Sequence, residues 1–130
     1  MAGSYFLTTA IDYVNSAPHL GHAYEKVLAD FFARHQLGLE KDVLFLTGVD
    51  EHGQKVQQSA QRENIEPQAF VDQTSARFQE LHKNLGVASS KFVRTTDPQH
   101  KAVVRDWLQK LHDKGEIFLE QHDEIGRAHV

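Results

Sequence analysis

The chain has 130 residues, of which 40% are hydrophobic and 25% charged, a composition that predicts one folded domain and excludes a disordered segment. A formal net charge of −4 excludes a generally basic surface for nucleic acid, and the absence of cysteine excludes disulfides and thiolate zinc sites. No basic leader or long apolar stretch opens the sequence, so we expect a cytoplasmic protein with no membrane partner.

The first predicted element is a buried strand over residues 5–11, which are rich in β-branched and aromatic side chains and lead into a turn-prone stretch at 12–18. An amphipathic helix is predicted from His19 to Gly38, because apolar residues recur there at spacings of three and four. These apolar residues are Leu20, Tyr24, Val27, Leu28, Phe31 and Phe32.

A second strand is predicted over residues 42–47 and closed by Gly48. Its uninterrupted apolar run is typical of a parallel sheet that is covered on both faces. A polar helix is predicted next, over residues 53–63, and Pro67 and Gly86 predict the start and the end of another helix.

A weaker strand is predicted over residues 91–95, and the sequence Thr96-Asp97-Pro98 begins a last helix that runs to Lys114. Trp107 lies at helical spacing among apolar residues and is interpreted as core. Other residues are interpreted as solvent-exposed, namely Lys26, Arg34, Lys41, Lys55, His35, His82, His100, His112 and His122.

Strands that alternate with helices predict an α/β fold with a parallel sheet, in which ligands bind beyond the carboxyl ends of the strands. The loops at 12–18 and 48–52 both lie at such ends. The last seven residues, 124–130, are what a common short-read sequencing adapter would encode, so we interpret this tail as an artefact and exclude it from the fold.

The sequence Pro18-His19-Leu20-Gly21-His22 lies where the first strand leads into the first helix. The N–H groups and positive dipole end of a helix start attract anions, and two imidazoles three residues apart share one face there. Gly21 would let an adenine or ribose ring lie against the backbone. The motif therefore predicts a phosphate site with electrostatic stabilisation by the histidines, although a solvated histidine pair or a fortuitous metal site is an alternative.

Three blocks of sequence, residues 6–25, 45–55 and 94–101, resemble the opening of bacterial methionyl-tRNA synthetases, which are class I aminoacyl-tRNA synthetases. The resemblance covers nearly the whole chain from Tyr5 to about Asp123 and implies the first half of a Rossmann-like (HUP-type) nucleotide-binding fold. It further implies that residues 1–123 are the amino-terminal part of the catalytic domain and reach the start of its inserted connective domain.

In that family the His19-Leu20-Gly21-His22 sequence matches the "HIGH" signature, which implies that residues 18–22 bind ATP and that His19 and His22 stabilise the transition state for adenylation. The resemblance also implies that Ala10, Ile11 and Tyr13 contact methionine and that Asp50 receives its ammonium group. From the residues alone, Asp50 could equally be a helix cap. Asp12 stands where many relatives have tyrosine or proline, so no contact is assigned to it.

The resemblance implies a parent enzyme that activates methionine with ATP and Mg²⁺ and transfers it to tRNA(Met) through regions that are absent here. A lysine-rich loop of KMSKS type and the zinc-binding insert are also missing from this sequence, so we expect zinc only in the missing insert, no metal in this chain, and an inactive fragment with exposed sheet and helix faces. The alternatives are another class I synthetase, a nucleotidyltransferase, or a truncated half-domain that only binds nucleotide.

Overall fold

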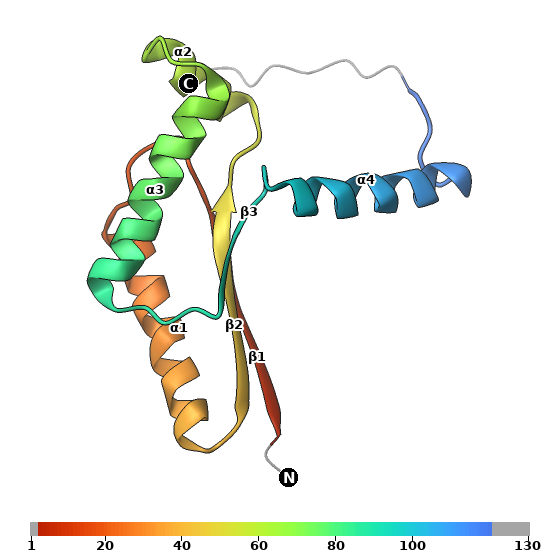
Figure 1. The fold of residues 1–130 in the computed structure, drawn as a ribbon. Helices are drawn as coiled ribbons and strands as arrows, with labels where there is room; N and C mark the ends of the chain where they lie inside the picture. The colour runs from red at the N-terminus through yellow and green to blue at the C-terminus, as the bar shows by residue number, and fades with distance from the viewer. Residues whose placement is uncertain (1–2, 121–130) are drawn as a thin grey trace, which may run out of the picture. The chain divides into compact units, whose positions relative to one another are not determined.

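The computed structural model describes residues 3–120, so the tail at 124–130 and its interpretation as an artefact lie outside the described residues. The chain divides into two compact units after Asp97, and each is described by itself. The first unit holds a three-stranded sheet and three helices, and the second holds one helix (Figure 1). The elements are β1 (Ser4–Tyr13), α1 (Leu20–Gly38), β2 (Asp42–Asp50), α2 (Gln54–Arg62), α3 (Pro67–Leu85), β3 (Lys91–Arg94) and α4 (Pro98–Asp113).

The sheet has the order β1-β2-β3, and both pairs of neighbouring strands are parallel. Every predicted helix and strand is found, and the predicted parallel α/β arrangement is confirmed. The helix ends follow local signals, because Pro67 occupies the first turn of α3 and Gly86 caps its end in the left-handed conformation with φ 67°.

Gly48 does not close β2, which continues for two residues to Asp50. A Cβ at this position would lie 2.1 Å from the carbonyl oxygen of Val93. The glycine is needed because β3 approaches the backbone of β2 closely, which is a tertiary requirement and not a turn signal.

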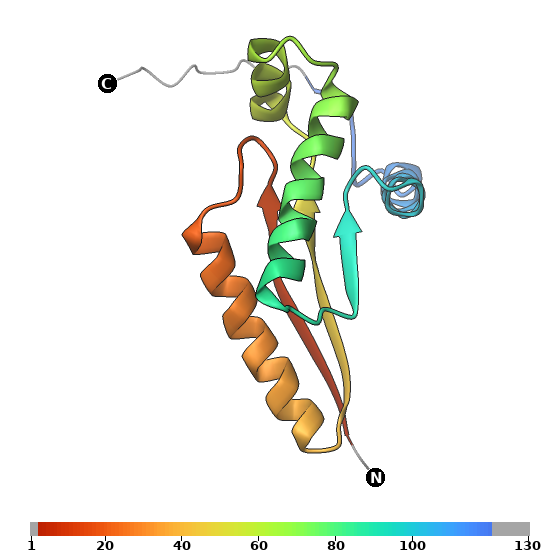
Figure 2. The ribbon, with the colours of Figure 1, turned by 60° about the vertical axis from the view of Figure 1, so that its left-hand side comes forward.

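Within residues 3–97, α1 and α3 cover one face of the sheet (Figures 1 and 2). Phe45 and Thr47 of β2 point to that face and are buried. On the opposite face Phe6 is 62% exposed and Leu44 is 51% exposed. The expectations of a buried first strand and of a sheet covered on both faces are therefore wrong within residues 3–97, because the helices of this unit cover one face only.

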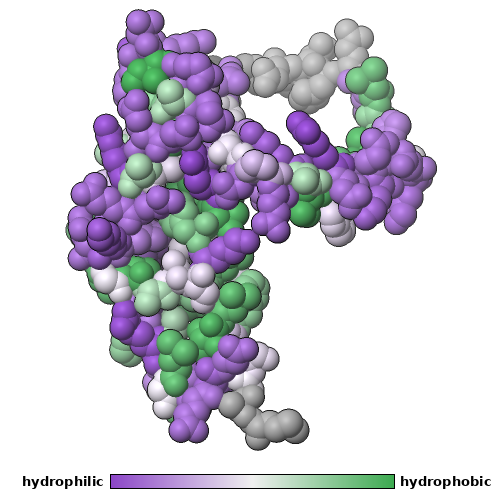
Figure 3. Space-filling model, in the orientation of Figure 1, coloured by the Kyte–Doolittle hydropathy of each residue, from purple (hydrophilic) through white to green (hydrophobic). Residues whose placement is uncertain are grey.

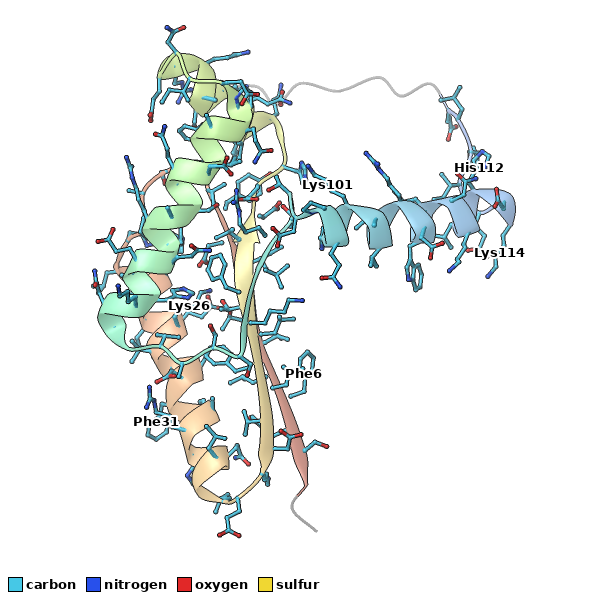
Figure 4. All side chains as sticks on the ribbon, in the orientation of Figure 1. Phe6, Lys26, Phe31, Lys101, His112 and Lys114 are labelled. Atoms are coloured by element: carbon cyan, nitrogen blue, oxygen red, sulfur yellow. The ribbon has the colours of Figure 1, made fainter. Side chains whose placement is uncertain are left out.

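The bounds predicted for α1 are confirmed, but it packs on the sheet with a different face from its apolar one. An amphipathic helix normally buries its apolar stripe, yet Leu20 is 84% exposed and Phe31 is 63% exposed. Phe31 points away from the sheet, and hydrophobic surface is visible over the part of the molecule formed by α1, β1 and β2 (Figures 3 and 4). The buried residues of α1 are Lys26, Ala29, Asp30 and Ala33.

Two features bring this polar face of α1 into the interior. The small side chains of Ala29 and Ala33 pack against Phe45 and let the helix approach the sheet closely. Asp30 accepts a hydrogen bond from the amide of Ala88 at 2.8 Å, which ties α1 to the segment after α3. The polar residues are therefore buried with partners, as burial of charge requires.

Helix α3 lies over a core cluster formed with the end of β2 and with α2. His82 belongs to its buried face and is 6% exposed, so its interpretation as solvated is wrong. Neither ring nitrogen of His82 has a hydrogen-bond partner. Burial lowers the pKa of His82, and the nearby charge of Lys26 lowers it further.

Replacing His82 by leucine should therefore reduce the acid sensitivity of the fold. Because the folded pKa lies below the ordinary value of 6.5, the unfolded chain binds more protons, and stability that is present above pH 6.5 is lost as the pH falls below it. Urea unfolding at pH 7.5 and pH 5.5 measures the difference. His112→Gln is the control, since that side chain is 69% exposed and its replacement should leave the pH dependence as it was; an unchanged pH dependence in His82→Leu would contradict this assignment.

In the second unit, α4 buries none of its side chains within the described residues. Trp107 is 63% exposed and Val103 is 56% exposed, so the interpretation of Trp107 as core is wrong there. The spacing of these residues is helical, but no described residue of the second unit covers them. No helix in residues 3–120 is both long enough and apolar enough to span a membrane.

Candidate functional site

The two histidines of the predicted phosphate site cap the start of α1. His19 is the N-cap residue, and its Nδ1 accepts a hydrogen bond from the amide of Gly21 at 3.1 Å. The amide of His19 donates in turn to Nδ1 of His22 at 3.1 Å, which completes a capping box. The two rings stack with their centroids 3.7 Å apart. The amide N–H groups of His19 and Gly21, which we predicted to be available for an anion, are therefore already bonded to the histidine rings.

This arrangement fixes which ring nitrogen carries the proton. A nitrogen that accepts a hydrogen bond carries no hydrogen, so each neutral ring holds its proton on Nε2. Both Nε2–H groups remain available as donors on the same turn of helix. Gly21 leaves room for this geometry, because a Cβ there would lie 2.9 Å from Cε1 of His19 and the ring would have to shift.

His22 is held in the neutral form by its surroundings. Its side chain is 19% exposed and packs edge-on against Phe78 of α3. Burial lowers the pKa of His22, and Asp12 partly opposes this because its Oδ1 lies 3.9 Å from Nε2. A neutral imidazole donates a hydrogen bond without bringing a formal charge, which suits stabilisation of charge that develops during a reaction.

Lys26, Asp12 and Glu25 form an ion group next to His22 that the sequence did not reveal, and two of its members are buried. Lys26 is 0% exposed, and its Nζ lies 3.1 Å from Oδ2 of Asp12 and 2.7 Å from Oε2 of Glu25. Asp12 is 6% exposed. The interpretation of Lys26 as a solvent-exposed charge is therefore wrong, and Asp12, which was assigned no contact, is one of its partners.

The same group holds the end of β1. The pairing of β1 with β2 shifts between Thr8 and Ile11, which leaves Ala10 in a bulge. The amide of Ala10 donates to Oε1 of Glu25 at 3.0 Å, and its carbonyl accepts from Nζ of Lys26 at 2.9 Å. Burial opposes ionisation of Glu25, but the hydrogen bonds that it accepts from Lys26 and from the amide of Ala10 outweigh burial and lower its pKa. The predicted contact of Ala10 with methionine stays a prediction, with both polar groups of its backbone already bonded.

The other residues predicted to contact methionine lie together at the carboxyl ends of β1 and β2. Tyr13 pairs in register with Asp50, and Ile11 pairs with Gly48. Ile11 is 47% exposed and Tyr13 is 41% exposed, so both can meet a ligand. The sheet register therefore brings Ile11, Tyr13 and Asp50 to one edge of the first unit.

Asp50 is not the cap of α2, so the helix-cap interpretation is wrong, while its contact with the methionine ammonium group stays a prediction. The N-cap of α2 is Gly53 with φ 118°, and no side chain bonds there. Instead, Oδ1 of Asp50 accepts from the amide of His52 at 3.3 Å. A carboxylate at a strand end that caps no helix is suited to receive a cation.

An open cleft of about 460 Å³ adjoins this edge and is lined by Tyr13, Asn15, Gln54 and Lys55. The hydroxyl of Tyr13 lies against Gly53, where a Cβ would approach it to 2.3 Å. Neither His19 nor Asp50 lines this cleft. The part of the chain that the structure describes thus brings the predicted residues to one edge but does not enclose them in one pocket.

Next to Asp50, the buried Glu51 organises a second polar network that sequence reasoning missed. Its Oε1 accepts from Nε of Arg94 at 2.7 Å and from the hydroxyl of Ser75, and its Oε2 accepts from the amide and the hydroxyl of Thr96. Burial opposes the charge on Arg94, but hydrogen bonds to Asp72 and Glu51 raise its pKa above the ordinary value. This network joins the ends of β2 and β3 to α3.

Across residues 3–120, no three histidine, aspartate or glutamate side chains are grouped so that they could hold a metal ion. The capping box and the strand end offer hydrogen-bond donation by two imidazole Nε2–H groups and a carboxylate, that of Asp50, which can attract a cation. One sequence signal pointed to the buried group, since Lys26 lies four residues after His22 and so shares its helix face. That signal could not show which face of α1 is buried.

The chain resembles known proteins over nearly all of its length. A family model described as tRNA synthetases class I (M) matches residues 5–125. The methionine-tRNA ligase of Deinococcus radiodurans is 46% identical over 120 residues, which are 92% of this chain and 18% of that protein. The corresponding ligase of Bacillus subtilis is 44% identical over the same shares of the two chains.

Among solved structures, that of Mycobacterium tuberculosis methionyl-tRNA synthetase bound by methionyl-adenylate is similar, with a TM-score of 0.83 and 39% identity. The similarity covers 86% of this chain and 22% of that one. The chain thus spans about a fifth of the length of the relatives it matches.

Proposed function

The chain belongs to the class I tRNA synthetase family (M), and on this premise we propose that it forms one wall of the active site of a methionine-tRNA ligase. Its three-stranded parallel sheet corresponds to the amino-terminal, Rossmann-like part of the solved relatives, so the predicted fold class is confirmed. We further propose that residues 1–123 are the amino-terminal part of the catalytic domain, up to the start of the inserted domain.

In the proposed reaction, the carboxylate of methionine attacks the α-phosphorus of ATP. The new bond is the mixed anhydride of methionyl-adenylate, and pyrophosphate leaves with the electrons of the broken bond. The methionyl group then passes to the terminal ribose of tRNA(Met), through parts of the enzyme outside this sequence. A ligase that charges tRNA works where its tRNA is, so the proposal includes the cytoplasm.

The observation that carries the proposal is the capping box of α1, which leaves two Nε2–H donors on one helix turn. We assign them to phosphate oxygens of ATP, where they stabilise charge that develops in the transition state. Pro18, Leu20 and Gly21 complete the nucleotide contact of this turn. Mg²⁺ would accompany the triphosphate as part of the substrate and supply further charge neutralisation.

Methionine would bind at the adjacent strand ends. Asp50 is placed to receive its ammonium group, and Ile11 and Tyr13 offer exposed side chains beside it. Ile11 and Tyr13 lie at the end of β1, the strand that precedes the capping box, and Asp50 lies beside Tyr13 at the end of β2. The amino acid and the nucleotide could therefore meet across one short segment of chain.

The test is amino-acid-dependent exchange of labelled pyrophosphate into ATP by the full-length protein that contains this chain. We expect exchange with methionine and not with leucine, valine, isoleucine or cysteine. Exchange with one of those instead would favour the alternative of another class I synthetase. The isolated chain should be inactive, since it holds one wall of the site, and a rate near that of the complete protein would contradict this assignment.

A further inference from the structure

The side chain of Lys26 joins the two segments to which the proposed function assigns ATP and methionine. It projects from α1, one turn after His22, and is completely buried (Figure 4). Its Nζ donates hydrogen bonds to the carbonyl of Ala10 at 2.9 Å and to Oε2 of Glu25 at 2.7 Å, and it forms an ion pair with Oδ2 of Asp12 at 3.1 Å. A lysine is almost never fully buried unless such partners hold it.

Each partner of Lys26 leads to the proposed site. The carbonyl of Ala10 belongs to the bulge of β1, one residue before Ile11. Asp12 lies next to Tyr13 in the same strand, and its other oxygen faces Nε2 of His22 at 3.9 Å. The ammonium group of Lys26 therefore contacts β1, which carries the residues proposed to bind methionine. Through Asp12 it also acts on the imidazole of His22, which is assigned to ATP.

We propose that Lys26 is a positioning residue that fixes the end of β1 and the ring of His22 in one arrangement, an assignment that rests on the proposed function. Without its ammonium group, the buried carboxylate of Asp12 would lose its cation, and the half-buried carboxylate of Glu25 would lose the donor that holds it 2.7 Å from Nζ. Both carboxylates lie within 3.1 Å of Nζ of Lys26, so without the cation they would repel each other, which favours hydration or protonation of one of them. The bulge at Ala10 and the orientation of His22 would then change together.

The charges around His22 are consistent with this role. From β1 it faces Asp12, and from α1 it faces His19, Glu25 and Lys26. On the side of α3, His22 contacts the ring of Phe78. The charges of Lys26 and Asp12 also act on the pKa of His82 in that helix, which Lys26 lowers and Asp12 raises. Lys26 offsets one of the two carboxylate charges beside the ring, so a phosphate that approaches the Nε2–H groups meets less negative charge.

The experiment compares Lys26→Met, which keeps the length of the side chain but removes its donors, with Phe45→Leu as control. Phe45 is 1% exposed and belongs to a core cluster that contains no residue of the proposed site. In methionine-dependent pyrophosphate exchange by the full-length protein, Lys26→Met should lower kcat on the order of 10–100-fold and raise KM for methionine more than KM for ATP. Phe45→Leu should lose thermal stability and keep kcat at temperatures where the protein is folded.

A double-mutant cycle separates positioning from stability. Asp12→Asn should lower kcat as well, and the double variant should be little worse than either single variant, because both act through one group. Multiplicative losses would overturn the proposal. So would a Lys26→Met enzyme whose kcat and KM values match those of Phe45→Leu at equal thermal stability.

A second readout does not depend on methionine exchange. In protein labelled with ¹⁵N-histidine, His22 should show an unprotonated Nδ1 and a protonated Nε2, and Lys26→Met should shift both signals while those of His112 stay in place. If the wild-type protein exchanges no pyrophosphate with methionine, the proposed function fails, and this spectrum still decides the role of Lys26. Unchanged His22 signals in Lys26→Met would overturn the inference.

Discussion

Replacing His19 by serine should lower methionine-dependent pyrophosphate exchange by about 10²–10³-fold, the effect of removing one preorganised donor to a transition state. The stability of the fold should barely change. His19 has two roles that lie on different atoms: Nδ1 caps the helix by accepting from Gly21, whereas Nε2 is the donor assigned to ATP. A serine hydroxyl at the N-cap performs the first role and cannot perform the second.

The matched variant is His19→Ala, which loses both roles. It should be as inactive as His19→Ser and, in addition, less stable by about 1 kcal/mol, the usual effect of removing a capping side chain. Thermal unfolding and exchange kinetics of the two full-length variants give the comparison. If His19→Ser kept most of the wild-type rate, capping would be the only role of this histidine, and the assignment of its Nε2–H to ATP would be wrong.

Replacing Arg94 by methionine should destabilise the protein by about 3–5 kcal/mol, the range measured when one partner of a buried ion pair is removed. The side chain of Glu51 is 0% exposed and would keep its charge without the 2.7 Å contact to Nε of Arg94. The hydroxyls of Ser75 and Thr96 would remain as donors but carry no compensating charge. The loss should appear as a lower urea midpoint by circular dichroism.

Two variants test the cause of this loss. Lys110→Met removes a pair on α4 whose side chains are 66% and 60% exposed, so it should change stability by no more than about 0.5 kcal/mol. Adding Glu51→Gln to Arg94→Met removes the uncompensated charge and should recover part of the loss. A cost of Arg94→Met as small as that of Lys110→Met would show that Glu51 does not depend on the pair.

The helix boundaries could be predicted because their causes are local. Pro67 cannot lie deep inside a helix and Gly86 adopts a left-handed conformation without strain, so both mark helix ends wherever the chain folds. The motif at residues 18–22 is also local, since the capping box needs only residues 19–22 and the helix they begin. Its place at the end of the first strand followed from the order of the elements.

Much of the candidate site could be named but not assembled from the sequence. The resemblance to methionyl-tRNA synthetases implied Ile11, Tyr13 and Asp50, and the register of β1 with β2 places them at one edge. The partners that hold this edge were missed. Asp12 and Lys26 lie fourteen positions apart, and a lysine in an amphipathic helix is usually solvated.

The sequence by itself determined the element order, the helix ends, the capping motif and the family of this protein, because each depends on neighbouring residues or on whole blocks of sequence. Only the tertiary structure decided which face of α1 meets the sheet, why Gly48 is glycine, and that Lys26 is buried. Hydropathy assigns the apolar stripe of α1 to the interior, but Ala29 and Ala33 permit a closer approach to Phe45 and the ions beside them find partners. These outcomes depend on side chains that are distant in sequence, and no local pattern contains them.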